Sequence, residues 1–563
     1  MGRKRGAGHS PQEVFALAYG HHRAGRLGEA ERLYRQVLAA VPGHADSLHL
    51  LGLIVKDRGC RHEAAGLIGR AIASKADQPV FYLNLGICMR GLGRLERAVA
   101  CYRRAIDLRP DYAGAWNNLG NAYFDQGRLE AAAACLKRAL VLSPDLAEAW
   151  NNLGTAALTA GRLIEAEVRF ERALALNPVY AEAYTNAGNA LKDQGRLEAA
   201  VARYGRALMV RPDFPEAVFN RSLALLRLGQ LAAGWEGYRY RWQTPRFAWR
   251  SYPQPLWEGG PVPGGRLLVW KEQGIGDEIM AAGLIPELMH RGLGVVLECE
   301  PRLVPLFARS FPGVEVVAAV PPGVEVVAPM PPEGAGIMAV PPEGAGITAV
   351  PPEGAGIAAH CPGGDLARHL RPAFEDFGRT VSPYLIADSA RRDGLRARYR
   401  RGATGPGLLV GLAWQTTSPV LGAARSLTLV ALFDVLAVPG LTWISLQYGD
   451  PERLAAEAAA AGVDLVVDRE IDQFTDLDGF AAQIAALDLV VCIDNSTAHL
   501  AGALGVPAWV LLPYAADWRW FLEREDSPWY PGLRLFRQRA LGAWAPVLRK
   551  VRDALAAMPS GSG

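Results

Sequence analysis

The sequence has few cysteines, and they form no recognisable pattern. Its seven cysteines are scattered through 563 residues, their number is odd, and no two are separated by only two residues. A disulfide framework and a zinc site both need cysteines at short, repeated spacings, so neither is expected. Reduced thiols are typical of a cytosol-like compartment, and we therefore expect a cytoplasmic protein without a bound metal.

The chain is also poor in net charge and in long apolar segments. Its formal net charge is +3, from 60 basic and 57 acidic residues, which is too small to indicate nucleic acid or an anionic membrane as the main partner. No apolar run approaches the roughly 18–20 residues that span a bilayer. The basic start MGRKRGAGHSPQEV is followed by no apolar core of a signal peptide. We therefore predict no membrane span and no nucleic-acid partner.

Glycine, in contrast, is abundant, and many of the 61 glycines recur with one period. Three series of residues share a spacing of 34 positions. The first is Gly52, Gly86, Gly120, Gly154 and Gly188, and the second is Gly25, Gly59, Gly93, Gly127, Gly161, Gly195 and Gly229. The third is Pro110, Pro144, Pro178 and Pro212, with Pro42 also in phase and Ala76 as the one gap. Independent series with one period predict a stack of similar structural units, with the second glycine series in the turns.

One unit, DYAGAWNNLGNAYFDQGRLEAAAACLKRALVLSP at 111–144, carries large apolar residues at Trp116, Leu119 and Tyr123. Their spacing places one apolar stripe on a first helix, small alanines let a second helix pack closely, and the proline ends that helix. The unit resembles the tetratricopeptide repeat, a helical hairpin of 34 residues. This resemblance implies an all-α solenoid of about seven repeats over residues 9–243.

A further series with the same period consists of asparagines on the first helix of successive units: Asn84, Asn118, Asn152, Asn186 and Asn220. A side-chain amide offers donors and an acceptor, which suits an extended peptide backbone. A similar asparagine ladder occurs in the superhelix of O-GlcNAc transferases. The series predicts a protein or peptide acceptor on the concave face. The alternative is that asparagine is simply common at this position of the repeat.

The composition changes after the repeats. Residues 244–265 are rich in proline, glycine and tryptophan and predict a connector. An aromatic cluster that includes Trp235 and Trp242 precedes it and is expected to pack the last repeat onto the next domain. Further on, the heptapeptide PPEGAGI occurs three times in a low-complexity stretch. Its proline and glycine density disfavours a packed core, so we expect residues 319–360 to be an insert outside the fold.

Around the insert, apolar strands alternate with helical segments. The predicted strands are 266–270, 294–299, 314–318, 408–413, 441–446, 464–467, 487–493 and 508–512, and a helix is predicted over 278–290. This alternation indicates parallel sheets built from βαβ units. We expect two Rossmann-type halves, 266–385 and 407–555, joined by a linker at 386–406, with a cleft between them. The first half has fewer recognisable strands, since 361–385 shows no clear β pattern. The fold class is thus α plus α/β.

The strongest chemical motif is LDLVVCIDNSTAHLAGALGVP in the second half. A buried strand ends at Asp494, a turn with Asn495 follows, and a helix begins at once, with Ser496 or Thr497 as its N-cap. The free N–H groups and the dipole of such a helix suit a diphosphate. His499 lies in the first helical turn, where its ring can donate to the same phosphate. The alternative is a structural strand–helix corner with a capping side chain and a packed histidine.

The segments DNSTAHLAGALGVP, LLPYAADWRW and DSPWYPGLRLFRQ resemble bacterial tetratricopeptide-repeat proteins with a glycosyltransferase family 9, heptosyltransferase-like domain. Apart from the insert, the resemblance covers about residues 266–545. It implies a GT-B-like pair of Rossmann-type domains in which a D-[TN]-x-x-x-H segment binds the diphosphate of a nucleotide sugar. The matching positions are Asp494, Asn495, Ser496, Thr497 and His499.

The first half carries a second motif, EQGIGDE, which starts at Glu272 after a strand and opens a helix. In heptosyltransferases the aspartate of the GD pair is the proposed general base, and Asp277 matches it. A carboxylate here would take the proton of an acceptor hydroxyl while the anomeric carbon becomes oxocarbenium-like. Gly274 and Gly276 would allow the backbone to approach the substrates closely. The alternative is that Asp277 only caps the helix.

The resemblance also implies that no metal is obligatory, so cations must stabilise the departing nucleotide diphosphate. Arg425 is a candidate clamp, because arginine offers phosphate a two-pronged donor, and Lys271 and Arg519 are others. Gln447, at the end of a strand, is expected at the rim of the cleft near the base or ribose. No cofactor is expected besides the nucleotide sugar, which is a substrate.

Two functions are compatible with these patterns. One is transfer of a sugar from a nucleotide-diphospho-sugar to a hydroxyl of a protein that the repeats recruit. The other is a non-catalytic adaptor or scaffold, whose α/β part is a degenerate glycosyltransferase-like domain. The sequence leaves open the sugar, the nucleotide, the acceptor, the stereochemical outcome and the oligomeric state.

Overall fold

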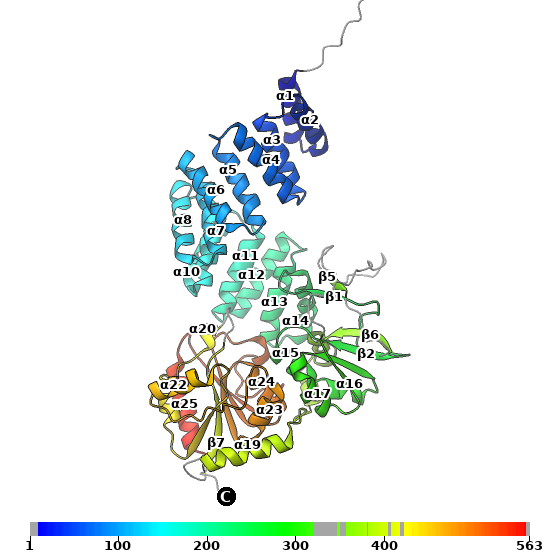
Figure 1. Ribbon diagram of the computed structural model, residues 1–563, viewed down its shortest axis with the longest axis vertical. Coiled ribbons are helices and arrows are strands. Elements are labelled where there is room, and N and C mark those ends of the chain that lie inside the picture. The colour runs from blue at the N-terminus through cyan, green and yellow to red at the C-terminus, as the bar shows by residue number, and fades with distance from the viewer. Residues whose placement is uncertain are drawn as a thin grey trace, which may run out of the picture. The chain divides into compact units, whose positions relative to one another are not determined.

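The computed structural model describes residues 10–319, 346–348, 356–379, 381–402, 407–416 and 422–558. The chain forms two compact units, Met1–Leu191 and Lys192–Gly563, which we call unit 1 and unit 2. The boundary lies inside the repeat array rather than at the expected connector. The last repeats therefore belong to the same compact unit as the α/β part (Figure 1).

Unit 1 is a stack of helical hairpins in which consecutive helices pack against each other. Its helices are α1 (Pro11–Arg23), α2 (Leu27–Ala40), α3 (Ala45–Asp57), α4 (Arg61–Ser74), α5 (Pro79–Gly91), α6 (Leu95–Leu108), α7 (Ala113–Asp125), α8 (Leu129–Leu142), α9 (Ala147–Thr159), α10 (Leu163–Leu176) and α11 (Ala181–Asp193), which ends just beyond the boundary. Unit 2 begins with α12 (Leu197–Val210), α13 (Pro215–Arg227) and α14 (Leu231–Tyr238). The predicted helical repeats are confirmed.

The two glycine series have different structural reasons. The turn glycines from Gly25 to Gly161 have φ between 70° and 85°, a left-handed conformation in which a side chain is strained. The other series lies where paired helices touch. A Cβ on Gly154, for example, would lie 2.6 Å from Cε1 of Phe170 on the next helix, so only glycine fits without a shift.

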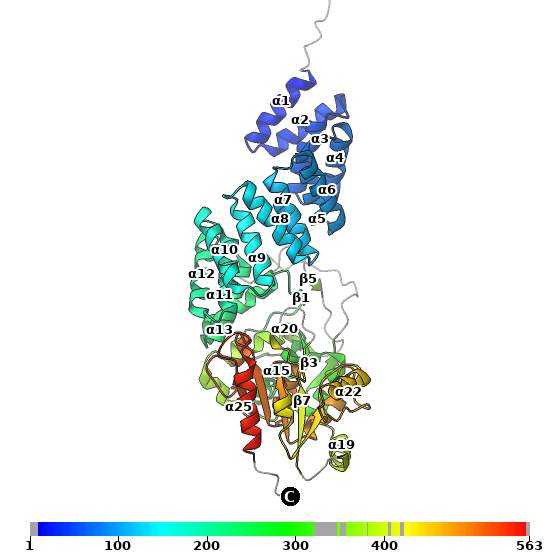
Figure 2. The same ribbon diagram turned by 90° about the vertical axis from the view of Figure 1, so that its left-hand side faces the viewer.

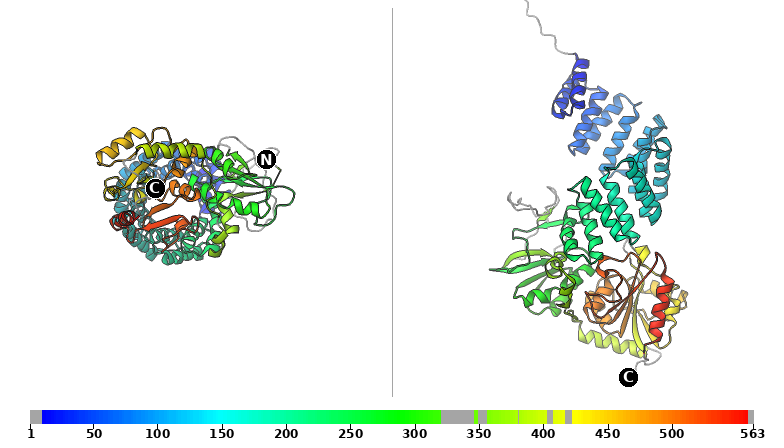
Figure 3. Two further views of the ribbon diagram at one scale, coloured as in Figure 1. Left: turned by 90° about the horizontal axis from the view of Figure 1, so that it is seen from below. Right: turned by 180° about the vertical axis from the view of Figure 1, so that it is seen from behind.

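Unit 2 contains two larger parallel sheets, which form separate bodies in Figure 3. The first has the order β4-β3-β2-β6 and consists of β2 (Arg266–Trp270), β3 (Val295–Cys299), β4 (Glu315–Ala318) and β6 (Ile357–Pro362). The intervening helices are α15 (Ile275–Ala282), α16 (Ile285–His290), the 3-10 turn Pro301–Leu303 and α17 (Val304–Ser310). In the register, Leu268 of β2 lies between Val296 and His360.

The first sheet is more complete than the sequence pattern suggests. β6 starts at Ile357, inside the expected insert 319–360, and supplies a fourth strand. β5 (Gly346–Thr348), also within that insert, pairs with β1 (Trp249–Ser251). The expectation that the whole insert lies outside the fold is therefore wrong, because backbone pairing needs no large side chains. The rest of the insert lies outside the described residues.

The helix predicted over 278–290 is also different. It begins earlier, at Ile275, and is divided into α15 and α16 by the segment around Gly283. The reason is Pro286, which has no N–H for the helix ladder and is favoured in the first turn of a new helix. The division leaves the EQGIGDE motif on a short helix of its own.

The second sheet has the order β11-β10-β9-β7-β8. Its strands are β7 (Leu408–Ala413), β8 (Leu441–Ser445), β9 (Leu489–Ile493), β10 (Ala508–Leu512) and β11 (Leu533–Arg537). Its helices are α20 (Gly422–Arg425), α21 (Phe433–Leu436), α22 (Pro451–Ala460), α23 (Leu477–Ala485), α24 (Ser496–Ala503) and α25 (Trp544–Ala556). The red helix of Figure 2 is α25, which packs on β11 and α21. Parallel sheets with helices confirm the α/β class.

Three segments of this part differ from the expectation. The predicted strand 464–467 contributes only one bridge, from Val466 to Ile444. β11 was not predicted, because two of the five residues of LRLFR are arginines and no apolar run stands out. The expected linker 386–406 contains α19 (Ser389–Gly402), which packs on α23. Shorter elements are α18 (Leu366–Leu370) and the 3-10 turns Arg239–Gln243, Gly363–Asp365, Phe374–Arg379 and Trp518–Trp520.

The aromatic cluster packs the last repeat onto the α/β part, as predicted. Trp235 of α14 lies edge-to-face on Trp518 with ring centroids 5.2 Å apart, and its indole N–H donates to the carbonyl of Arg371 at 2.9 Å. Trp242 packs on Trp270 of β2 with centroids 5.4 Å apart. These buried contacts explain why the last repeats belong to unit 2.

Candidate functional site

Both chemical motifs lie at the carboxyl ends of parallel strands. In the first sheet the strand order reverses between β2 and β6, and the motif that starts at Glu272 follows β2. In the second sheet the order reverses between β7 and β9, and Asp494 directly follows β9. Connections leave such a switch point in opposite directions, which opens a crevice where ligands commonly bind. The fold thus favours a ligand at both motifs.

Asp277 lies in the first turn of α15 and has two partners. Its Oδ2 accepts a hydrogen bond from the backbone N–H of Gly274 at 3.1 Å, so it caps the helix. Its Oδ1 forms an ion pair with Arg519 of the second half. Asp277 therefore does cap the helix, as the alternative hypothesis from the sequence proposed, but capping uses only one of its carboxylate oxygens. The other oxygen connects the two motifs.

Gly276 provides the second connection. A Cβ at this position would lie 2.9 Å from Cδ2 of His499, so glycine lets α15 approach α24. The His499 ring is buried, and its Nδ1 lies 2.9 Å from the Tyr530 hydroxyl. Burial, together with the charges of Arg519 and Arg425, lowers the pKa of His499 to about 3. The imidazole is therefore neutral at pH 7 and has one N–H to donate.

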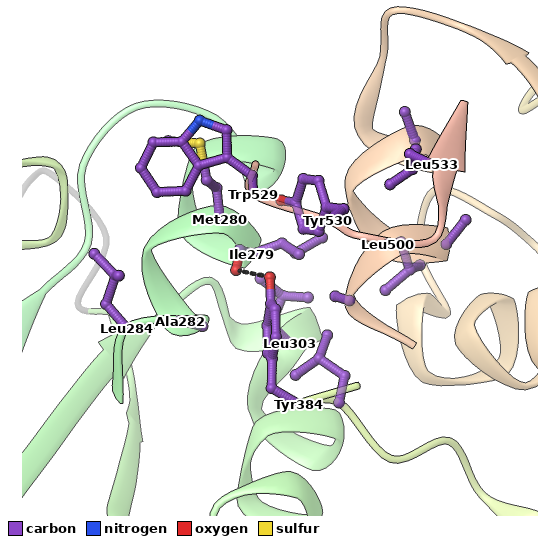
Figure 4. Packing of buried hydrophobic residues seen from close by; sticks show 14 of the residues in the cluster. Ile279, Met280, Ala282, Leu284, Leu303, Tyr384, Leu500, Trp529, Tyr530 and Leu533 are labelled. Atoms are coloured by element: carbon purple, nitrogen blue, oxygen red, sulfur yellow. Dashed lines mark hydrogen bonds between the residues drawn. The ribbon is translucent and has the colours of Figure 1, made fainter. Parts of the chain in front are cut away.

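The surroundings of this contact are apolar. Figure 4 shows Ile279 and Met280 of α15 close to Tyr530 and to Leu500 of α24. The hydroxyl of Tyr384 donates to the carbonyl of Ile279 at 2.7 Å. The two halves are therefore joined by a packed apolar layer beside the polar motifs.

The turn after β9 is built as a helix cap. The side-chain oxygen of Asn495 accepts from the backbone N–H of Thr497 at 3.1 Å, which makes Asn495 the N-cap. The cap thus lies one residue before Ser496 and two before Thr497, the two predicted positions. Ser496 is half-buried and opens α24, while Thr497 is buried. The arrangement leaves the N-terminal end of α24 at the switch point.

Asp494 is buried and holds two side chains in place. Its Oδ1 accepts from the indole N–H of Trp520 at 2.7 Å, and its Oδ2 lies 3.2 Å from Nη1 of Arg425. Burial raises the pKa of Asp494, and the charge of Arg425 opposes this shift. An anionic Asp494 would repel a phosphate, so its role in this geometry is to orient Arg425.

Arg519 joins the motifs into one charged network. It pairs with Asp277 and, at 2.5 Å, with Asp517, which also lies 4.0 Å from Arg425. Burial disfavours the charge of Arg519, but the two carboxylates outweigh it and raise the pKa of the guanidinium. Asp517 belongs to the segment LLPYAADWRW but was not singled out from the sequence, because its contacts with Arg519 and Arg425 depend on the tertiary fold.

Two other predicted residues are occupied by protein contacts. Gln447 is buried, and its side-chain oxygen accepts from the backbone N–H groups of Trp414 and Gln415 at 3.1 and 2.8 Å. It therefore shapes the turn after β7 instead of standing at a rim. Lys271 pairs with Glu300 and lies 3.6 Å from Glu278.

Glu278, beside Asp277, has the most distinctive titration in the motif. Burial raises its pKa to about 7, although the N–H of Glu300 and the charge of Lys271 favour the carboxylate. A carboxyl that titrates near neutral pH is a feature of sites that transfer protons. Glu278 is part of EQGIGDE and so belongs to a motif visible in the sequence, but its burial depends on the tertiary fold.

The space beside Asp277 is small in this conformation. The cavity lined by Asp277, Gln273 and Arg519 has a volume of about 10 Å³, which is room for about one water molecule. Any ligand larger than a water molecule would therefore need the Asp277–Arg519 contact to open.

The asparagines in unit 1 are half-buried, and their amides hydrogen-bond within the array. The Nδ2 of Asn152 donates to Asn117 and that of Asn186 to Asn151, each at 3.0 Å and each in the preceding repeat. Asn84 pairs with His49 at 2.9 Å, whereas Asn118 donates to Gly114 of its own helix at 2.8 Å. Asn220, on α13 of unit 2, is also half-buried. Part of the hydrogen-bonding capacity of the ladder is thus structural.

Comparison with known families identifies the repeats. Sequence profiles described as TPR repeat match residues 90–127, 120–161 and 188–229. Profiles described as tetratricopeptide repeat match 151–201 and 14–36. The chain therefore contains tetratricopeptide repeats, as its period of 34 predicted. In the described residues, no helix is long and apolar enough to cross a membrane, and no group of acidic, histidine and cysteine side chains could hold a metal ion.

Protein FlbA of Caulobacter vibrioides is 33% identical to this chain over 333 residues, which are 57% of this chain and 52% of FlbA. The chain thus spans about half the length of that relative. Among solved structures, PilW, a type IV pilus biogenesis factor, is 22% identical, with a TM-score of 0.35 over 38% of this chain and 98% of PilW. YrrB, described as a TPR protein with an unusual peptide-binding site, is 18% identical, with a TM-score of 0.27 over 34% of this chain and 98% of YrrB.

Proposed function

We propose that unit 2 transfers a sugar from a nucleotide-diphospho-sugar to a hydroxyl of an acceptor. The observation that carries the proposal is the contact between the motifs of the two halves. Arg519 pairs with Asp277, and Gly276 packs on His499, so residues about 220–240 positions apart in the sequence meet at the switch points. The resemblance to glycosyltransferase family 9 assigns these motifs to base and diphosphate binding.

In the proposed reaction the residues have separate roles. The N-terminal end of α24 at Ser496 receives the diphosphate, which the helix dipole favours. Arg425, oriented by Asp494, supplies a cation for the leaving group. Asp277 accepts the proton of the acceptor hydroxyl once Arg519 has moved to the incoming phosphates. No metal and no cofactor takes part, and we place the reaction in the cytoplasm.

The repeats supply the acceptor in this proposal. Tetratricopeptide repeats bind protein or peptide partners, and the exposed part of the asparagine series offers amide groups along the first helices. The Nδ2 of Asn152 uses one N–H for Asn117 and retains a second one, although its carbonyl oxygen accepts from Asn151 at 3.5 Å. We therefore assign Asn84, Asn118, Asn152, Asn186 and Asn220 to acceptor binding.

The closed contact also favours a second candidate. A cavity of about 10 Å³ beside Asp277 and a buried Gln447 fit a non-catalytic domain whose halves never separate. The chain would then act as a tetratricopeptide-repeat adaptor with a degenerate glycosyltransferase-like domain.

Donor binding and turnover distinguish these functions. A panel of UDP-, GDP- and ADP-sugars is tested for an increase in melting temperature and for hydrolysis or transfer. The variant Asp277→Asn should keep donor binding and lose turnover by about 100-fold or more, as expected for a general base. Asp478→Asn is the matched control, because it removes an ion pair between the halves, with Arg309, away from both motifs.

An enzyme requires that at least one donor raises the melting temperature and is turned over by the wild type and by Asp478→Asn. Full activity of Asp277→Asn would exclude Asp277 as the base. If no donor binds and none is turned over, the chain is not a glycosyltransferase, and the non-catalytic adaptor is the better explanation.

A further inference from the structure

A larger pocket of unit 2 lies away from both motifs, where α13 meets the carboxyl ends of β10 and β11. Its volume is about 770 Å³, within the range of roughly 300–1,000 Å³ that small-molecule sites occupy. Arg227 of α13, Tyr514 after β10 and Arg537 at the end of β11 contribute to its walls. One wall therefore comes from a repeat and the other from the second sheet.

The lining of this pocket is strongly basic. Three acidic side chains face six cationic ones, which are Arg227, Arg524, Arg534, Arg537, Arg539 and Lys550. The excess of positive charge in this one pocket equals the net charge of +3 of the whole chain. Such local concentration attracts anions, because a concave surface of one sign focuses the field.

Several buried donors of the pocket have no acceptor. Arg227 is 6% exposed, and its Nη2 donates to the carbonyl of Tyr514 at 2.9 Å. Its Nε, the Nε of Arg524 and the Nε2 of Gln538 have no hydrogen-bond partner among the described residues. Buried donors without acceptors are unfavourable, and a bound anion would satisfy them.

Only some of these arginines have a carboxylate partner: Arg524 pairs with Asp526 at 2.7 Å, whereas Arg537 donates to the backbone carbonyls of Arg524 and Trp520. Burial, together with the positive charges of Arg227 and Arg524, lowers the pKa of Arg537 to about 10. Two residues of the adjoining loop, Phe521 and Glu523, have a left-handed φ of 52°. Non-glycine residues keep such strained conformations mainly where the surrounding structure requires them, as at ligand sites.

We propose that this pocket binds a small organic polyanion with at least two phosphate or carboxylate groups, held by Arg227, Arg524 and Arg537 and by the exposed cations Arg539 and Lys550 of the same pocket. The planar fork of each guanidinium matches both kinds of anionic group. Because Arg227 belongs to a repeat helix and Arg537 to the sheet, the bound anion joins the end of the repeats to the α/β part. This ligand is distinct from the proposed donor, which binds at α24.

The test uses the full chain and tripolyphosphate as the probe, titrated by calorimetry at low salt. The double variant Arg539→Gln/Lys550→Gln removes two exposed cations of the pocket and should weaken binding at least 10-fold. The double variant Arg401→Gln/Arg549→Gln removes the same charge from exposed positions elsewhere and should bind like the wild type. Arg425→Gln, at the proposed donor site, should also bind like the wild type.

Three results would overturn the proposal. The first is the absence of saturable tripolyphosphate binding by the wild type. This holds also if a hexaglutamate peptide binds in its place, because the ligand would then be a peptide and not a small anion. The second is equal weakening in both double variants, which would indicate general charge attraction. The third is loss of binding only in Arg425→Gln, which would assign the anion to the donor site. Failure of the donor panel leaves all these outcomes unchanged, so the two proposals fail separately.

Discussion

At the scale of the residue, Glu278 couples the stability of unit 2 to pH. Its pKa is raised by burial from 4.5 to about 7. Between these values the folded chain retains a proton that the unfolded chain releases, so the free energy of unfolding falls as pH rises. This stability is fully present below about pH 4.5 and is lost as pH rises through 7.

In the wild type, the free energy of unfolding should fall by about 3 kcal/mol between pH 4.5 and 8 because of Glu278, given roughly 1.36 kcal/mol per pKa unit. We predict that Glu278→Gln removes this fall. Urea denaturation of unit 2 at several pH values measures it. The exposed Glu375→Gln serves as the control and should leave the profile unchanged. Parallel profiles for wild type and Glu278→Gln would contradict the assignment.

The asparagine series contains a second test at this scale. Asn152 donates to the side chain of Asn117 in the preceding repeat. Asn118 donates instead to the backbone carbonyl of Gly114 in its own helix. Asn152→Ala leaves a buried acceptor unpaired and should lower the free energy of unfolding of unit 1 by about 1–2 kcal/mol. Asn118→Ala should lower it by less than about 0.5 kcal/mol. Equal losses in denaturant titrations would show that the bond between repeats contributes nothing.

At the scale of the element, sequence patterns predict best where burial is uniform. The apolar runs of β2, β7 and β10 gave the strand bounds to the residue, because each is buried along nearly its whole length. The period of 34 predicted the helical repeats, although the bounds of their individual helices come from the structure. β6 and β11 were missed, because β6 emerges from a proline- and glycine-rich stretch and β11 carries one arginine on each face, which hides the alternation of a strand.

The same reasoning explains what was predictable of the site. Asp277 and His499 stand in short motifs at strand ends, and such positions can be identified from local patterns. Their connection through Arg519 could not, because the ion pair joins residues 242 positions apart. The asparagine bonds likewise depend on the neighbouring repeat. Asn152 donates to Asn117, 35 positions before it, but the residue 35 positions before Asn118 is Leu83, which has no acceptor in its side chain.

The close helix pairs allow a prediction for one element. Gly154→Ala places a methyl group 2.6 Å from Phe170, so overpacking outweighs the gain in helix propensity. We expect a net loss of about 1–2 kcal/mol in the stability of unit 1. Gly66→Ala, in the interior of α4 with no atom within 4 Å of its added Cβ, should instead stabilise by up to about 1 kcal/mol. Thermal unfolding of both variants tests this prediction. If both variants are less stable than the wild type, overpacking against Phe170 is not the cause of the loss in Gly154→Ala.

At the scale of the whole molecule, the division into two compact units determines which elements should unfold together. The boundary at Leu191 assigns α12–α14 to the α/β part, so the last repeats and the two sheets should unfold together. The remaining repeats have their own apolar core, in which each hairpin packs on its neighbours. We therefore expect two calorimetric transitions, one for each compact unit.

Trp235 tests this division. It is 2% exposed, packs on Trp518 and donates to the carbonyl of Arg371, so Trp235→Ala leaves a cavity and an unpaired carbonyl inside unit 2. The transition of unit 2 should lose about 3–5 kcal/mol, while that of unit 1 stays in place. Trp116→Ala, a half-buried tryptophan of unit 1, is the matched control and should shift only the other transition. If Trp235→Ala shifts both transitions equally, the chain unfolds as one cooperative body, and the last repeats do not belong to the α/β part alone.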